Sequence, residues 1–154
     1  MDLSNLQELQ VKAIKNGTVI DHIPPELLFK VVSLLQLDGT KNRLTIGNNL
    51  TSKKMQKKGI IKISDRYYAD EEISRIALIA PLAKINVIKE FEVIEKKVLS
   101  PPDSFKGIVK CPNPKCITNN EPMKTSFDVI NKNPILLKCT YCEREIQQHD
   151  IQLL

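Results

Sequence analysis

Hydrophobic and polar residues alternate along several short segments in the first two thirds of the chain. Residues 9–15 alternate strictly and are followed by Asn16-Gly17, a pair typical of tight hairpin turns. We therefore expect a strand at 9–15, a turn, and a returning strand at 18–23. The same alternation predicts further strands at residues 43–50, 59–63, 83–88 and 91–96.

Two segments with helical periodicity separate these strands. Pro24-Pro25-Glu26 suits the first turn of a helix that ends near Gly39, and its apolar side chains recur on one face at Leu27, Leu28, Val31, Leu34 and Leu35. A second helix is expected to begin with Asp70 as its N-cap and to stop before Pro81. This order predicts an α+β fold of ferredoxin-like type, an antiparallel sheet with two helices on one face.

A domain boundary is expected at residues 99–104, because consecutive prolines in a polar setting favour neither a helix nor a sheet. The first domain would then span residues 1–98 and the second residues 105–154. Beyond the boundary, alternation at 105–109, 125–129, 135–138 and 143–148 predicts a small all-β, zinc-ribbon-like domain.

All four cysteines lie in this second domain, as Cys111-x4-Cys116 and Cys139-x2-Cys142 separated by 22 residues. Two close pairs of thiolates are the usual ligand set of a tetrahedral zinc ion. A pair of disulfides is the alternative, but it requires an oxidising compartment, and nothing at the N-terminus resembles a secretion signal. The pattern favours one structural zinc ion in a cytoplasmic protein. A four-thiolate site leaves no open position for catalysis, and a domain of this size commonly requires a metal to fold.

The charge distribution bears on possible partners. The chain carries a net charge of +5, of which residues 1–97 contribute +4 and residues 98–154 only +1. The alternative function is that of a zinc ribbon that binds nucleic acid. The near-neutral charge of the second domain and its few aromatic residues disfavour this alternative. No apolar run approaches the length of a membrane-spanning helix, and no acid–base constellation points to a stand-alone enzyme.

The first domain offers an anion site made of side chains. Lys62 lies within an apolar strand and Lys96 at the end of the last one, while Lys53, Lys54, Lys57 and Lys58 crowd a loop that is solvated or meets an anion. Asp21 and His22 end the second expected strand, where alternation places their side chains on opposite faces. Neither glycine-rich phosphate motif occurs, so Lys62, Lys96 and Asp21 would have to bind a nucleoside phosphate themselves.

Several stretches carry a resemblance to a known family: residues 10–24, 44–50, 78–83, 85–88, 111–117 and 137–143. The chain resembles the regulatory chain of aspartate carbamoyltransferase, an enzyme of pyrimidine synthesis. The combination of Gly-Thr-Val-Ile-Asp-His-Ile with the cysteine spacing is highly specific, and the matches run in the family's order over nearly the whole length.

The resemblance implies a noncatalytic subunit. Its first domain would pair into regulatory homodimers and bind CTP as inhibitor and ATP as activator at one shared site. Its zinc domain would dock onto catalytic chains and link their trimers. The resemblance leaves open whether Mg²⁺ accompanies the nucleotide.

The resemblance also implies residue roles. Asp21, Lys62 and Lys96 match ribose and phosphate contacts, and Lys58 matches a further basic position near the phosphates. Other matched positions are His22 and Asn86, which influence the response, Ile14, whose backbone helps read the base, and Val93, which lines the pocket.

Overall fold

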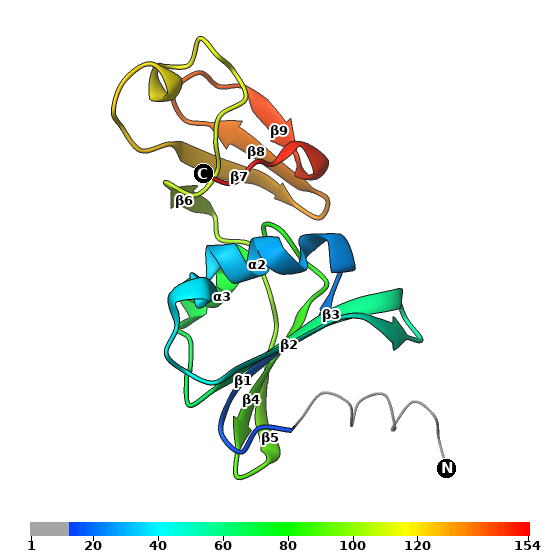
Figure 1. The fold of residues 1–154 in the computed structure, drawn as a ribbon. Coiled ribbons are helices and arrows are strands. Elements are labelled where there is room, and N and C mark those ends of the chain that lie inside the picture. Colours follow the sequence, from blue (N-terminus) through cyan, green and yellow to red (C-terminus); the bar gives the residue numbers. More distant parts are fainter. Residues whose placement is uncertain (1–12) are drawn as a thin grey trace. The chain divides into compact units, whose positions relative to one another are not determined.

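The structure, a computed structural model, describes residues 13–154, which divide into two compact units between Leu99 and Ser100 (Figure 1). No helix in this described part of the chain is long and apolar enough to cross a membrane. Each unit contains one antiparallel sheet, and each is considered separately.

The sheet of the first unit has five antiparallel strands. Their order in space is β2-β3-β1-β4-β5, so the first strand is central and has a neighbour on each side. The bounds are β1 (Gly17–Ile23), β2 (Leu44–Ser52), β3 (Gln56–Ser64), β4 (Lys84–Lys89) and β5 (Glu92–Lys97). The first four strands and the two helices follow the connectivity of a ferredoxin-like fold, and β5 adds an edge strand, which confirms the predicted fold class.

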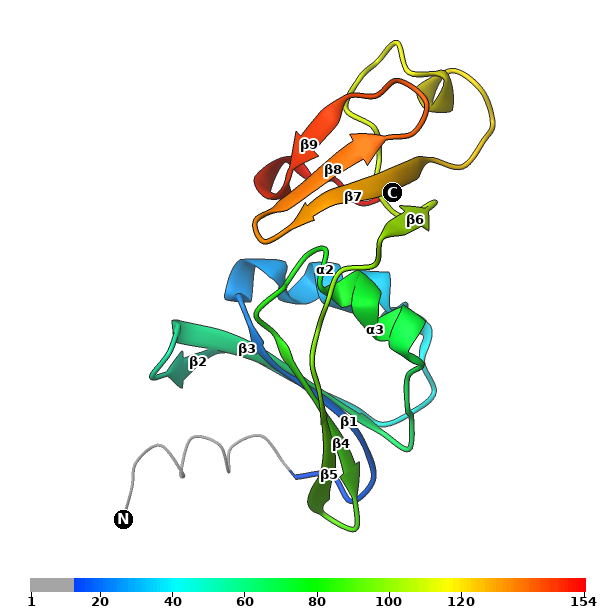
Figure 2. The same cartoon turned by 180° about the vertical axis from the view of Figure 1, so that it is seen from behind.

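Both helices, α2 (Leu28–Leu34) and α3 (Asp70–Ile76), cover the same face of this sheet (Figures 1 and 2). Short 3-10 turns at Pro25–Leu27 and Leu37–Gly39 flank α2. The main core lies between sheet and helices, where Ile20, Ile61 and Ile85 of the strands belong to one cluster with Val31 and Ile76 of the helices. Alternate residues on the strands face this core because successive side chains point to opposite sides of a sheet.

On the opposite face of the sheet, residues 13–154 place no helix (Figure 2). Val19, Ile60 and Ile88 form a smaller buried cluster there together with Ile14, and Leu50 packs against it. We call this side the open face. It combines apolar residues near its centre with the polar and charged residues described below.

The prediction of an N-terminal hairpin is wrong in the part that the structure describes. Residues 9–12 lie outside the described residues, and Ala13 to Asn16 are not in a strand. Residues 18–23 form a strand as expected, but β1 pairs with β3 and β4, which occupy both of its edges. Asn16 instead makes hydrogen bonds to two segments that are distant in sequence. Its backbone oxygen accepts a hydrogen bond from Asp65 N, and its side-chain oxygen accepts one from Glu90 N.

Gly17 occupies a position that no other residue fits. Its φ is +142°, and a Cβ there would lie 2.0 Å from the backbone oxygen of Ile63. We expect Gly17→Ala to lower the free energy of unfolding by about 2 to 4 kcal/mol, from backbone strain and overpacking together. Urea denaturation followed by circular dichroism measures this. Gly39→Ala is the matched control, because a Cβ at Gly39 meets nothing within 4 Å; equal stability of the two variants would contradict the account.

Two local predictions need correction. Asp70 is the first residue of α3, and the N-cap is Ala69. The backbone N–H of Ala69 donates a hydrogen bond to the Glu72 carboxylate, with an N–O distance of 3.3 Å. Lys57 and Lys58 belong to strand β3, so the lysine-rich loop is reduced to a tight turn that contains Lys53 and Lys54. The sequence prediction began this strand at Gly59, next to the apolar residues. The pairing of β3 with β2 begins earlier, at Gln56, which is paired with Ser52.

The second unit contains a four-stranded antiparallel sheet in the order β6-β7-β8-β9. The ring of Phe105 stacks on that of Phe127 across the β6–β7 pair, with centroids 5.7 Å apart. Short 3-10 turns lie at Ile117–Asn119 and Gln148–Asp150. All four strands overlap the segments predicted from alternation; their bounds are β6 (Ser104–Lys106), β7 (Ser126–Lys132), β8 (Ile135–Cys139) and β9 (Glu145–Gln147).

Candidate functional site

The four cysteines of the second unit meet at one point. Their sulfur atoms all lie within 4.8 Å of one another, and Cys111, Cys116 and Cys139 are buried. The Sγ atoms of Cys111 and Cys142 are 3.6 Å apart, and those of Cys116 and Cys139 are 3.8 Å apart. Four sulfurs placed about 2.3 Å from a central zinc ion in a tetrahedron would be separated by about 3.8 Å. The cluster therefore has the dimensions of a tetrathiolate zinc site.

Two asparagines hold the first cysteine loop in shape. The side-chain amide of Asn119 donates to the backbone oxygens of Cys111 and Asn113 at 2.9 and 2.8 Å. The amide of Asn120 donates to the backbone oxygen of Cys116 at 2.8 Å. Our reading of the sequence missed these residues, although paired asparagines just after a cysteine loop are a plausible indication of side-chain bonds to its carbonyls.

Burial has a clear effect on these thiols. It raises the pKa of Cys111 to about 12 and also raises the pKa of Cys139. At Cys142 burial acts in the same upward direction, but hydrogen bonds, chiefly from the backbone of Arg144, lower its pKa to about 7. A bound divalent cation stabilises the thiolate form of the cysteines that coordinate it. A metal ion at this site would therefore offset the unfavourable free energy of burying thiolates. The four residues fit zinc, and with no open position the ion would serve to fold the domain.

The open face of the first unit contains a cavity of about 290 Å³. Val19, Ile60 and Ile88 form part of its apolar lining, and Leu50 adds to it. Five residues singled out in the sequence also line this cavity: Asp21, Lys58, Lys62, Asn86 and Val93. An apolar pocket with a few convergent polar groups is the usual form of a small-molecule site.

Strand register explains how residues distant in sequence meet there. Val19 of β1 is paired with Lys62 of β3 on one side and with Asn86 of β4 on the other. Asn86 is in turn paired with Lys96 of β5. Paired residues project from the same face of a sheet, so these four residues form a row across the open face with a lysine at each end. Lys96 does not line the cavity itself but extends this row.

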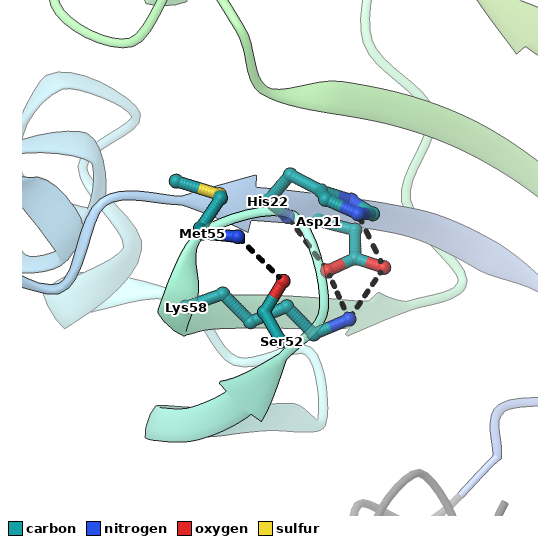
Figure 3. Close-up of polar contacts among 5 residues, drawn as sticks. All are labelled: Asp21, His22, Ser52, Met55 and Lys58. Carbon is teal, nitrogen blue, oxygen red and sulfur yellow. Dashed lines mark hydrogen bonds and ion pairs between the residues drawn. The ribbon is translucent and has the colours of Figure 1, made fainter. Parts of the chain in front are cut away.

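Asp21 is the centre of a polar cluster at the edge of the cavity (Figure 3). The ammonium group of Lys58 lies 3.0 Å from one carboxylate oxygen of Asp21 and 3.3 Å from the other. The backbone N–H of His22 donates to the same carboxylate at 2.6 Å. Lys58 is buried, and the pairing with Asp21 offsets the cost of burying its ammonium group.

The expected separation of Asp21 and His22 on opposite faces is not observed. His22 has a φ of +59°, and the pairing of β1 with β3 shifts register between Ile20 and Ile23. Such a bulge interrupts the alternation of side chains, so the imidazole Nδ1 lies 3.5 Å from a carboxylate oxygen of Asp21 (Figure 3). At this distance Nδ1 makes no hydrogen bond and is buried without a partner in the part of the chain described.

Burial lowers the pKa of His22 below 6.5. The Asp21 carboxylate acts against this, whereas the ammonium groups of Lys58, Lys84 and Lys54 act with it. His22 is therefore mainly neutral at pH 7, and its ring can accept a hydrogen bond as well as donate one.

Ile14 is buried at the end of the open face, in the same apolar cluster as Val19. It also lines a second cavity of about 350 Å³, together with Arg43 and Phe91. The structure thus places Ile14 beside the main cavity but not in its lining. Sequence reasoning did not identify Val19, Leu50 or Thr51 as residues that line the cavity. Their proximity to the charged residues follows from strand pairing, which the sequence pattern alone does not give.

Comparison with known proteins agrees with this division into two units. Residues 9–100 match the family model described as aspartate carbamoyltransferase regulatory chain, allosteric domain. Residues 103–152 match the model described as aspartate carbamoyltransferase regulatory chain, metal binding domain. Together the two matches cover nearly the whole chain.

Individual relatives give the same result. The aspartate carbamoyltransferase regulatory chain of Bacteroides fragilis is 59% identical over 150 residues, which are 97% of this chain and 98% of that one. The regulatory chain of Phocaeicola vulgatus is 58% identical over 150 residues, 97% of each chain. That of Pyrococcus horikoshii is 43% identical over 148 residues, 95% of this chain and 97% of its own. The chain belongs to the family of aspartate carbamoyltransferase regulatory chains, and it is a noncatalytic chain with an allosteric domain and a metal-binding domain.

Proposed function

We propose that residues 1–98 bind CTP and ATP at one site on the open face and that residues 105–154, folded around one zinc ion, dock onto catalytic chains. The observation that carries the proposal is the row formed by Lys62, Val19, Asn86 and Lys96, which borders a cavity on the open face. In this proposal the two lysines hold the phosphates and Asp21 holds the ribose hydroxyls. Charged ammonium groups suit phosphate oxygens because such charge-assisted hydrogen bonds are the stronger ones.

Asp21 can bind ribose without releasing Lys58. A carboxylate offers about four lone-pair sites. Lys58 and the backbone N–H of His22 already donate to it, and a ribose hydroxyl can donate to a remaining site. In this arrangement Lys58 fixes the orientation of the carboxylate and adds positive charge beside the phosphates. His22 and Asn86 border the same region and tune the response.

The base would lie toward Ile14 and Val93. Val93 lines the cavity and is paired with Ile88, while Ile14 belongs to the neighbouring apolar cluster. CTP and ATP share ribose and phosphates, so these groups supply affinity common to both. The size and edge of the base then decide which quaternary state each nucleotide prefers. A nucleotide that bound both states equally would shift nothing, and a coupling free energy of about 1 to 3 kcal/mol is typical.

The assembly follows from the same proposal. The first domains pair into homodimers, and the zinc domains join the catalytic trimers, in the cytoplasm. The proposal is tested by mixing the purified chain with catalytic trimers and measuring carbamoyltransferase activity with and without CTP or ATP. We expect a larger complex whose activity depends on both nucleotides. A mixture that stays unassembled, or an assembled complex whose activity ignores both nucleotides, would contradict the proposal.

A further inference from the structure

The four cysteines of the second unit differ in how far water can reach them. Cys111, Cys116 and Cys139 are buried, whereas Cys142 is partly exposed. Four thiolates around one divalent cation leave two net negative charges in this cluster. Buried negative charge is costly unless hydrogen-bond donors surround it. At Cys116, which is 1% exposed, the protein itself has to supply such donors.

The backbone around Cys116 is held by hydrogen bonds on both sides of its sulfur. Cys116 is the N-cap of the 3-10 turn Ile117–Asn119. Its N–H donates to the backbone oxygen of Asn113 at 3.0 Å. Its own oxygen accepts hydrogen bonds from Asn119 N at 3.0 Å and from the side-chain amide of Asn120 at 2.8 Å. In the described second unit, the sulfur accepts no capping hydrogen bond from the backbone of this turn.

The hydroxyl of Thr118 reaches the sulfur instead. Its Oγ1 lies 3.2 Å from Cys116 Sγ. Either atom can donate when Cys116 is a thiol, but a metal-bound thiolate carries no proton, so the hydroxyl must then be the donor. A β-branched side chain has few allowed χ1 rotamers, and the hydrogen-bonded loop fixes the backbone from which this side chain projects.

We infer that Thr118 is a positioning residue of the metal site, which strengthens zinc binding by donating a hydrogen bond to the Cys116 thiolate. This inference rests on the proposed zinc site and extends it to a residue outside the four ligands. The hydrogen bond stabilises negative charge on a sulfur that is buried. Water can replace such a donor at the partly exposed Cys142, but hardly at Cys116.

The test measures the zinc affinity of the full chain by competition with a chromogenic chelator. Thr118→Val keeps the branched shape of the side chain but removes the hydroxyl. We expect its affinity to fall about tenfold, the lower end of the effect typical of losing a hydrogen-bond partner of a metal ligand. Thr118→Ser retains the hydroxyl and should bind zinc nearly as tightly as the wild type.

Thr140→Val is the matched control for this pair of variants. Thr140 follows the ligand Cys139 directly in the chain, but its hydroxyl donates to Ser126 Oγ at 3.1 Å. The substitution therefore removes a hydroxyl beside the metal site without removing a donor to a sulfur. It should leave the zinc affinity nearly unchanged.

Cobalt-substituted protein distinguishes loss of the hydrogen bond from a general effect on the loop. A hydrogen bond to a thiolate lowers the energy of the sulfur lone pairs and so tunes the metal site. At saturating Co²⁺, the sulfur-to-cobalt charge-transfer band should therefore shift to longer wavelength in Thr118→Val. The band should keep its position in Thr118→Ser and in Thr140→Val.

Several results would overturn the inference. These are unchanged affinity in Thr118→Val, an equal loss in Thr140→Val, and a Thr118→Ser variant that binds zinc no better than Thr118→Val. Reduced affinity without a shift of the cobalt band would also overturn it, because Thr118 would then only support the fold of the loop. A wild-type chain that binds no zinc would instead contradict the proposed function, which is distinguishable from failure of this inference alone.

Discussion

Chelating the zinc ion should unfold residues 105–154 and release the catalytic trimers. Metal binding to structural cysteine sites supplies about 10 to 16 kcal/mol at neutral pH, which exceeds what a domain of this size can gain from its core. The second unit buries one aromatic pair and a handful of aliphatic residues, and the closed cysteine cluster joins the loop after β6 to the β8–β9 turn. Loss of the ion removes that connection and leaves thiols that are costly to bury as thiolates.

The release can be followed by size-exclusion chromatography, with thiol titration to count exposed cysteines. Cys139→Ser should reproduce the effect without a chelator, because it removes one buried ligand. Thr140→Ser is the matched control in the same turn, since it retains the hydroxyl that contacts Ser126 at 3.1 Å. Catalytic trimers that remain bound to metal-free chain would show that the docking assignment is wrong.

Replacing Lys62 or Lys96 with alanine should weaken CTP and ATP together. Each lysine sits at one end of the row on the open face and is proposed to contact phosphate, which both nucleotides share. A hydrogen bond to a charged group contributes about 1.5 to 3 kcal/mol, so we expect affinity to fall about 10- to 100-fold for both nucleotides. Equilibrium dialysis with each nucleotide measures this directly.

Lys57→Ala serves as the control for this pair of variants. Lys57 is exposed on the same strand as Lys62, five residues away, and alternation places it on the other face. It removes the same charge and should leave both affinities within about twofold. If Lys62→Ala and Lys96→Ala behaved like this control, neither lysine would belong to the site.

The elements of the second unit were the easiest to predict from the sequence. The cysteine spacing is set by coordination chemistry, which depends little on the rest of the fold. Most of the strands around it alternate, as β8 shows with its buried Ile135, Leu137 and Cys139, although a bulge interrupts β7 between Val129 and Asn131. Asn119 and Asn120 were missed because their role depends on the path of the loop, which spacing alone does not determine.

Predictions that depended on tertiary pairing were less successful. Asn16-Gly17 is a strong local hairpin pattern, but the long-range partners β3 and β4 occupy both edges of β1. Similarly, the bulge at His22 arises from register with β3 and cannot be inferred from residues 18–23. Local patterns favoured a hairpin and strict alternation, and non-local strand pairing overrode both.

The candidate nucleotide site shows the same contrast. Asp21 and Lys62 stood out because charged residues in apolar strands need a reason to be there. Their arrangement relative to Asn86 and Lys96 followed only from the strand order, since it requires knowing that β1 lies between β3 and β4. The resemblance to a known family supplied the positions, and the paired strands supply a physical reason for their proximity.

The central claim is that one site on the open face binds both CTP and ATP. Its most direct test is a competition experiment, in which labelled CTP bound to the assembled protein is titrated with unlabelled ATP. The account predicts that ATP displaces CTP completely, and that Lys62→Ala weakens the binding of both nucleotides by the same factor. Incomplete displacement at saturating ATP, or simultaneous binding of both nucleotides to one chain, would contradict it.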